Sequence, residues 1–99
     1  MTRVRVEDRD AGGDASRLLR AAVESKVRRL RLSIEATEAR LRALESRYGR
    51  TSAEVMATAR AEDLAGGDLD YVEWLGEWRM LQHLKQDLGR LEAIEYADR

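Results

Sequence analysis

Residues 19–48 constrain the fold of this chain more than any other stretch, because apolar side chains recur in them at every third or fourth position. The recurring residues are Leu19, Val23, Val27, Leu30, Ile34, Leu41, Leu44 and Tyr48. Only Thr37 interrupts the series, and it could either specify the register of packing or pack through its methyl group. The spacing predicts one helix, over residues 15–48 and roughly 50 Å long, with a straight apolar stripe. Such a helix cannot bury its own stripe, so another helix must cover it.

The composition favours one small helical domain over residues 14–99. Charged residues make up 37% and hydrophobic residues 43% of the 99-residue chain, and no proline interrupts long helices. The absence of cysteine excludes disulfides, thiol nucleophiles and thiolate metal sites. No apolar run approaches the roughly 20 residues that span a bilayer, and the N-terminus does not resemble a signal peptide. We therefore expect a cytoplasmic protein that makes no use of a membrane.

Charge is distributed unevenly along the chain, although the net charge is only −1. Residues 17–50 carry ten basic and four acidic side chains, whereas residues 51–99 carry five basic and eleven acidic ones. Two interpretations are open. Either the two halves fold back on each other so that opposite charges meet, or the basic half faces an acidic or nucleic-acid partner.

Residues 1–13 form a separate N-terminal segment. Val4 and Val6 alternate with Arg3 and Arg5, which predicts either a short strand that pairs with another chain or a flexible tail. The paired glycines within residues 10–14 predict a hinge after it.

Helix-capping residues predict where the first helix begins and ends. Asp14 or Ser16 could accept hydrogen bonds from the free N–H groups at its start. Gly49 suits the left-handed position that follows a helix, so the first helix should end at Tyr48.

A short second helix and a long third helix should follow. Thr51 and Glu54 have the spacing of a capping box, which predicts a second helix over residues 52–63, ended by Gly66 and Gly67. Its residues available for packing are Val55, Met56, Ala59 and Leu64. Asp68 and Asp70 then predict the start of a third helix over residues 69–96.

The apolar residues of the third helix divide into an aromatic half and a leucine half. Tyr71, Trp74 and Trp78 cluster on one side, and we expect them to meet Tyr48 where the helices join. Trp74 and Trp78 could serve as core residues or as interface anchors. The leucine half lies further round the helix and should pack on the long helix or on a second protomer; it consists of Leu84, Leu88 and Leu91.

No pattern of catalytic, cofactor-binding or metal-binding residues is recognisable. His83, the single histidine, lacks a glutamate three residues before it, and the acidic residues of the stretch 68–77 are explained by helix starts. We therefore predict no enzyme, no cofactor and no metal. Arg28, Arg29 and Arg31 form a basic run that is either a solvated, ion-paired face or a candidate nucleic-acid contact.

Residues 48–74 contain a recognisable pattern, which consists of Tyr48-Gly49 at a helix end, then Glu54, then Asp70 followed by Glu73-Trp74. This pattern resembles small prokaryotic antitoxin-like proteins of the TumA type. Arg50 and Val55 stand where that pattern has Met and Phe. The resemblance implies a protein that binds and neutralises a toxin encoded by the adjacent gene.

Together these features predict an all-α fold, a long antiparallel helical hairpin with a short connecting helix that dimerises into a four-helix bundle. The expected interface residues are the helical seam Val23, Val27, Leu30, Ile34, Leu41, Leu44, Leu84, Leu88 and Leu91. The expected function is an antitoxin-like binding module. The alternatives are a structural coiled-coil scaffold or adaptor, and a nucleic-acid-associated protein.

Overall fold

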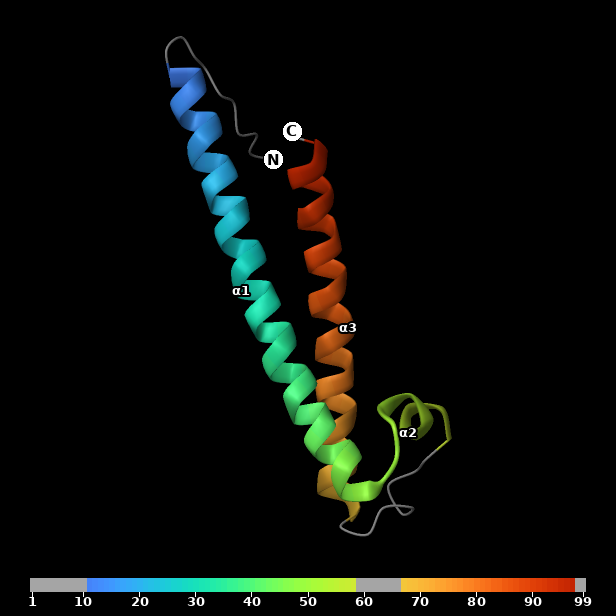
Figure 1. Cartoon of the computed structure of the whole chain (residues 1–99). Coiled ribbons are helices and arrows are strands. Elements are labelled where there is room, and N and C mark those ends of the chain that lie inside the picture. Colours follow the sequence, from blue (N-terminus) through green and yellow to red (C-terminus); the bar gives the residue numbers. More distant parts are fainter. Residues whose placement is uncertain (1–10, 59–66, 98–99) are drawn as a thin grey trace.

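The fold was obtained as a computed structural model, which describes residues 11–58 and 67–97, with backbone alone at residues 11–12 and 67–68. These residues form three helices, α1 (Ala11–Tyr48), α2 (Ser52–Thr58) and α3 (Gly67–Ala97). The two long helices run antiparallel and pack against each other, and α2 lies beside their joined end (Figure 1). The predicted all-α hairpin with a short connecting helix is confirmed. The N-terminal strand predicted around Val4 and Val6 lies outside the described residues.

The molecule is a thin rod. Its principal extents are 64 × 26 × 19 Å and its radius of gyration is 19.5 Å, whereas a compact domain of this length would have a radius of about 13 Å. In Figure 1 the long helices are closest beside α2 and diverge toward the chain termini. We call these two regions the closed end and the open end of the hairpin.

The end of α1 follows the prediction and its start does not. Gly49 has a φ of 66°, and the N–H groups of Gly49 and Arg50 both donate to the Glu45 carbonyl, at 2.8 and 3.3 Å. At the other end α1 already begins at Ala11, so the predicted hinge over residues 10–14 is wrong. Each glycine costs a helix only about 1 kcal/mol, which a long helix tolerates. Asp14 lies inside the first turn and pairs with Arg17 at 2.6 Å.

The start of α2 is the predicted capping box. The Glu54 N–H donates to the Thr51 hydroxyl at 3.1 Å, and the Thr51 N–H donates to the Glu54 carboxylate at 2.9 Å. The backbone bond to Thr51 is the main reason that the pKa of Glu54 is lowered. The structure describes α2 as far as Thr58, so the predicted remainder of this helix, with Ala59 and Leu64, lies outside the described residues.

The start of α3 differs from the prediction. The helix begins at Gly67, two residues earlier than expected and at a residue that was expected to end the preceding helix. Asp70 therefore does not cap α3. It accepts a hydrogen bond from the Tyr48 hydroxyl and pairs with Arg47 at 3.1 Å, so it joins α3 to the end of α1 instead.

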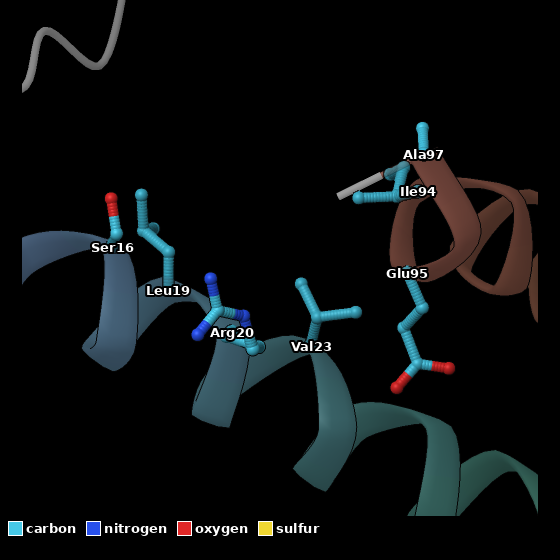
Figure 2. A pocket seen from close by; sticks show the side chains of 7 residues that line it. All are labelled: Ser16, Leu19, Arg20, Val23, Ile94, Glu95 and Ala97. Atoms are coloured by element: carbon cyan, nitrogen blue, oxygen red, sulfur yellow. The ribbon is translucent and has the colours of Figure 1, made fainter. Parts of the chain in front are cut away.

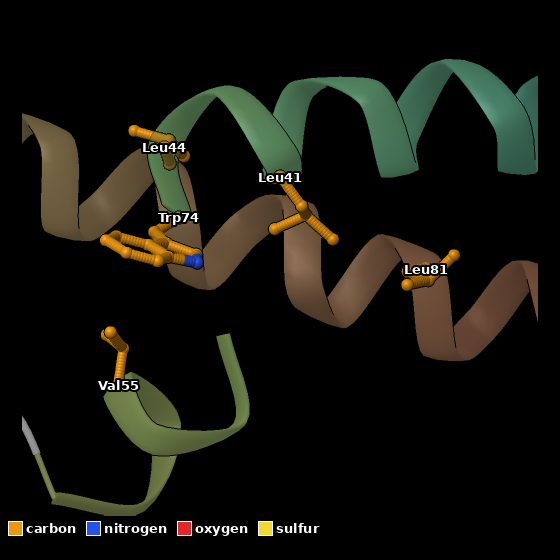
Figure 3. Packing of buried hydrophobic residues seen from close by; sticks show 5 residues of the cluster. All are labelled: Leu41, Leu44, Val55, Trp74 and Leu81. Carbon is orange, nitrogen blue, oxygen red and sulfur yellow. The ribbon is translucent and has the colours of Figure 1, made fainter. Parts of the chain in front are cut away.

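The core lies at the closed end and draws on all three helices. Figure 3 shows Leu41 and Leu44 of α1, Trp74 and Leu81 of α3, and Val55 of α2, which points toward the Trp74 indole. Trp74 and Val55 are fully buried. Burial of large apolar side chains contributes most of the stability of a small domain, so this end holds the hairpin together.

The four predicted aromatic residues do gather around this core. Tyr48, Tyr71 and Trp78 pack against it half-buried, and the rings of Tyr48 and Trp74 lie 5.7 Å apart between centroids. The Trp74 indole N–H donates to the Ser52 hydroxyl at 2.8 Å, and the Ser52 N–H donates to the Glu45 carboxylate at 2.7 Å. Trp74 is thus a core residue with a satisfied polar group, whereas Trp78 keeps part of its indole exposed.

Burial divides the predicted helical seam into two groups. The residues buried between the long helices are Val27, Leu30, Leu41 and Leu44, together with Leu81 of α3. The residues that remain half-buried are Val23, Ile34, Leu84, Leu88 and Leu91. Thr37 is buried and its hydroxyl accepts a bond from Arg40 at 3.3 Å, so it packs within the seam. One hairpin therefore covers only part of its own seam.

Candidate binding surface at the open end

Ion pairs connect α1 to α3 along the hairpin. Arg31 pairs with Glu92. The Arg40 guanidinium lies 2.9 Å from the Glu77 carboxylate. With Arg47 and Asp70, these pairs follow the antiparallel order of the helices. Opposite charges of the two halves do meet, as the first of the two interpretations expected. Exposed pairs of this kind contribute about 0–1 kcal/mol each to the free energy of unfolding. Their main effect is therefore to favour one register of α3 along α1.

The closed end adds a polar contact of its own. The hydrogen bond to Asp70, with partial burial and the negative charge of the same carboxylate, raises the pKa of the Tyr48 phenol, while Arg47 opposes the shift. Because the phenol stays a donor to Asp70, it ties the last turn of α1 to the first turns of α3.

At the open end the two helices leave an apolar groove of about 410 Å³, which we call the open-end groove. Its lining residues are Ser16, Leu19, Arg20 and Val23 of α1 and Ile94, Glu95 and Ala97 of α3. Figure 2 shows Leu19 and Val23 of α1 bordering an open space, with Ile94 of α3 on the other side of it. The Glu95 side chain points from α3 toward α1.

The sequence of α3 explains why the groove is left open. Trp74, Leu81 and Leu88 follow one another at intervals of seven, and the next position in this series is Glu95. A carboxylate there cannot cover the apolar stripe of α1. Leu19 consequently keeps 46% of its surface exposed and Ile94 keeps 53%, although both belong to the apolar patterns of their helices.

The predicted nucleic-acid residues lie on α1 outside the lining of the groove. Arg28 is exposed, the Arg29 guanidinium donates to the Ser25 hydroxyl at 2.6 Å, and Arg31 is paired with Glu92 of α3. Two of the three guanidinium groups are therefore already engaged within the chain.

Sequence reasoning missed three residues that decide these surfaces. Ser52 and Glu45 carry hydrogen bonds at the closed end, and the contact of Ser52 with Trp74 was not predictable from local spacing because the two residues are 22 positions apart. Glu95 could have been found by counting heptads from Trp74.

The open-end groove is suited to binding apolar side chains, since hydrocarbon groups dominate its lining. In the part of the chain that the structure describes, no three His, Cys, Asp or Glu side chains come together as a metal-binding group. Within the same residues, no helix has the length and hydrophobicity needed to cross a membrane. Comparison with protein-family models, with curated proteins and with solved structures finds no match for this chain.

Proposed function

We propose that this protein is an antitoxin-like helical binding module that sequesters a partner protein at the open-end groove. The observation that carries the proposal is the exposure of Leu19 and Ile94 on facing helices. Two helices with an apolar groove between them accept a third amphipathic helix, which is a recurrent mode of protein recognition. The resemblance of residues 48–74 to antitoxin-like proteins supports a toxin encoded by the adjacent gene as the partner.

Co-expression with the product of the adjacent gene tests this function. We expect the two proteins to co-purify and the growth inhibition caused by that product to be relieved. Replacing Leu19 and Ile94 together by Asp should abolish both effects, because charges cannot enter an apolar interface. Leu32→Asp is the matched control, since Leu32 is 65% exposed on α1 and lies outside the groove lining. Absence of co-purification and of growth relief with the wild-type chain would overturn the proposal.

The free protein is proposed to be a homodimer in which a second hairpin completes a four-helix bundle. Leu84, Leu88 and Leu91 support this, because they follow a seam that one hairpin leaves half-buried. Light scattering of the free protein at micromolar concentration should report twice the mass of the chain. A monomeric mass would contradict the bundle, and a dimer without any partner protein would favour the structural scaffold.

Nucleic-acid association is the weaker alternative, because Arg29 and Arg31 are engaged within the chain. It would gain support from duplex binding with a steep salt dependence that is lost when Arg28, Arg29 and Arg31 are all replaced by Ala.

A further inference from the structure

We propose that a second surface, on the outer side of α3 beside α2, binds an acidic protein segment that carries a bulky apolar residue. This surface is a shallow hollow of about 500 Å³, which we call the Trp78 hollow. Its principal lining residues are Met56 of α2 and Leu75, Trp78, Arg79, Gln82 and His83 of α3. The proposal rests on the proposed function in that it treats the chain as a binding module.

The charge of the hollow is the opposite of what the α3 sequence indicates. Residues 67–97 contain seven acidic and three basic side chains, yet none of the described residues that line the hollow is a carboxylate. Asp70, Glu77 and Glu92 are paired with arginines of α1. Pairing within the hairpin thus draws acidic groups of α3 toward α1 and leaves hydrogen-bond donors on its outer side.

Arg79 provides a cation that is available to a ligand. Its side chain is exposed and has neither a hydrogen bond nor an ion pair among the described residues. The Asp87 carboxylate, eight residues after Arg79, lies 3.5 Å from His83 of the hollow and 3.4 Å from Arg90. A guanidinium without a partner favours a carboxylate, which it can bind through two parallel hydrogen bonds.

The floor of the hollow is apolar and rests on the core. Trp78 packs against the core cluster on one side and is half-buried, as are Met56 and Leu75. Because the Trp78 indole packs against the core cluster, it loses little conformational freedom when a ligand covers its exposed face. Tryptophan and arginine are also the residues enriched at binding hot spots. The arrangement suits a ligand with an apolar side chain on the indole and a carboxylate on Arg79.

A protein segment fits these observations better than nucleic acid does. Strong binding to nucleic acid depends on several cationic contacts with phosphates, whereas the hollow offers one arginine beside an apolar floor. The hollow and the open-end groove share no lining residue in the described part of the chain, so the two surfaces can be tested separately.

A random 15-residue peptide library displayed on phage, selected on the full-length wild-type protein, tests the proposal. Each round includes counter-selection on the folded variant Arg79→Glu, so that only peptides that need Arg79 survive. We expect survivors with Asp or Glu close to Leu, Phe or Trp. The corresponding synthetic peptides should quench tryptophan fluorescence and bind Arg79→Glu at least about tenfold more weakly, since a hydrogen bond to a charged group contributes that much.

Arg28→Glu is the matched control, because Arg28 is an exposed arginine on α1 outside both surfaces. It should bind the peptides as the wild type does, and circular dichroism melts should show that both variants remain folded. Survivors without acidic residues, a pool that binds both variants equally, or tight binding of a 15-base DNA strand that depends on Arg79 would overturn the inference.

The outcomes separate this inference from the proposed function. If the product of the adjacent gene binds and is unaffected by Arg79→Glu while acidic peptides are selected, both proposals hold and concern different ligands. If acidic peptides are selected but that product never binds, the Trp78 hollow stands and the toxin partner falls. If no Arg79-dependent peptide emerges while that product binds through Leu19 and Ile94, the hollow falls alone.

Discussion

The closed and open ends of the hairpin are built from the same two helices but differ in what covers them. At the closed end α2 adds Val55 and Ser52 to the seam, and the indole of Trp74 is both buried and hydrogen-bonded. At the open end there is no third described element, and Leu19 and Ile94 keep about half of their surface exposed. Two helices alone cannot enclose an apolar stripe, and a third element makes the difference.

This difference indicates that the two ends contribute unequally to the stability of the hairpin. The closed end supplies burial, capping and polar contacts, which are the sources of stability in a small helical domain. The open end contributes less to stability, because Leu19 and Ile94 remain about half exposed. Substitutions at the two ends should accordingly have unequal effects on folding.

The largest effect is expected from Trp74→Ala. Removing this buried indole leaves a cavity and an unpaired Ser52 hydroxyl, so the free energy of unfolding should fall by about 3–5 kcal/mol. Urea denaturation followed by circular dichroism measures the change. Leu32→Ala, at an exposed position of α1, should change stability by less than about 0.5 kcal/mol. Equal losses in the two variants would show that the closed end is not the stabilising end.

An intermediate effect is expected from Gly49→Ala at the end of α1. Gly49 has a φ of 66°, and this left-handed conformation costs other residues about 1 kcal/mol even though the space beside it is open. The same change at Gly76, in the interior of α3 with equally open space, should raise stability by about 0.5–1 kcal/mol. Paired urea titrations should show opposite signs, and the same sign at both sites would contradict the capping role of Gly49.

A pH-dependent effect is expected from Glu54 in the capping box. Its pKa is lower in the folded chain, so its stabilising contribution is present above the unfolded value of about 4.5 and is lost as the pH falls below it. Between roughly pH 6 and pH 3, the Tm of the wild type should therefore decrease more than the Tm of Glu54→Gln, whose amide does not titrate. Parallel pH profiles of the two proteins would show that the box contributes nothing.

The smallest effect is expected from Ile94→Ser at the open-end groove. Because Ile94 is 53% exposed, its replacement should change the free energy of unfolding of the chain by no more than about 0.5 kcal/mol. The measurement should be made at protein concentrations at which light scattering shows a monomer, so that dimer formation does not contribute. A loss comparable to that of Trp74→Ala would mean that the groove belongs to the core.

Local patterns in the sequence were sufficient for most of the fold. The heptad spacing from Leu19 to Tyr48 predicted α1, Gly49 predicted its end, and Thr51 with Glu54 predicted the start of α2. These signals work because each depends on residues within one or two turns of helix. The hinge predicted from the glycines at residues 12 and 13 was wrong for the same reason, because local propensity alone overstated the cost of these glycines to a 38-residue helix.

Longer-range features were not accessible from local patterns. Asp70 has the spacing of a helix cap, but in the structure its carboxylate binds Tyr48 and Arg47 at the end of the other long helix. Likewise the acidic composition of residues 51–99 did not indicate a surface such as the Trp78 hollow, whose described lining residues include no carboxylate, whereas Glu77 and Glu92 of α3 pair with arginines of α1.

By itself the sequence determined that this protein is helical, that its first long helix ends at Tyr48, and that its apolar seam needs to be covered. Those properties follow from backbone propensity and from the period of apolar residues, which act over short distances. Only the tertiary structure decided which part of the seam is covered. That outcome depends on where α2 docks against Trp74 and on how the two long helices diverge toward the open end, and both are relations between residues distant in the chain.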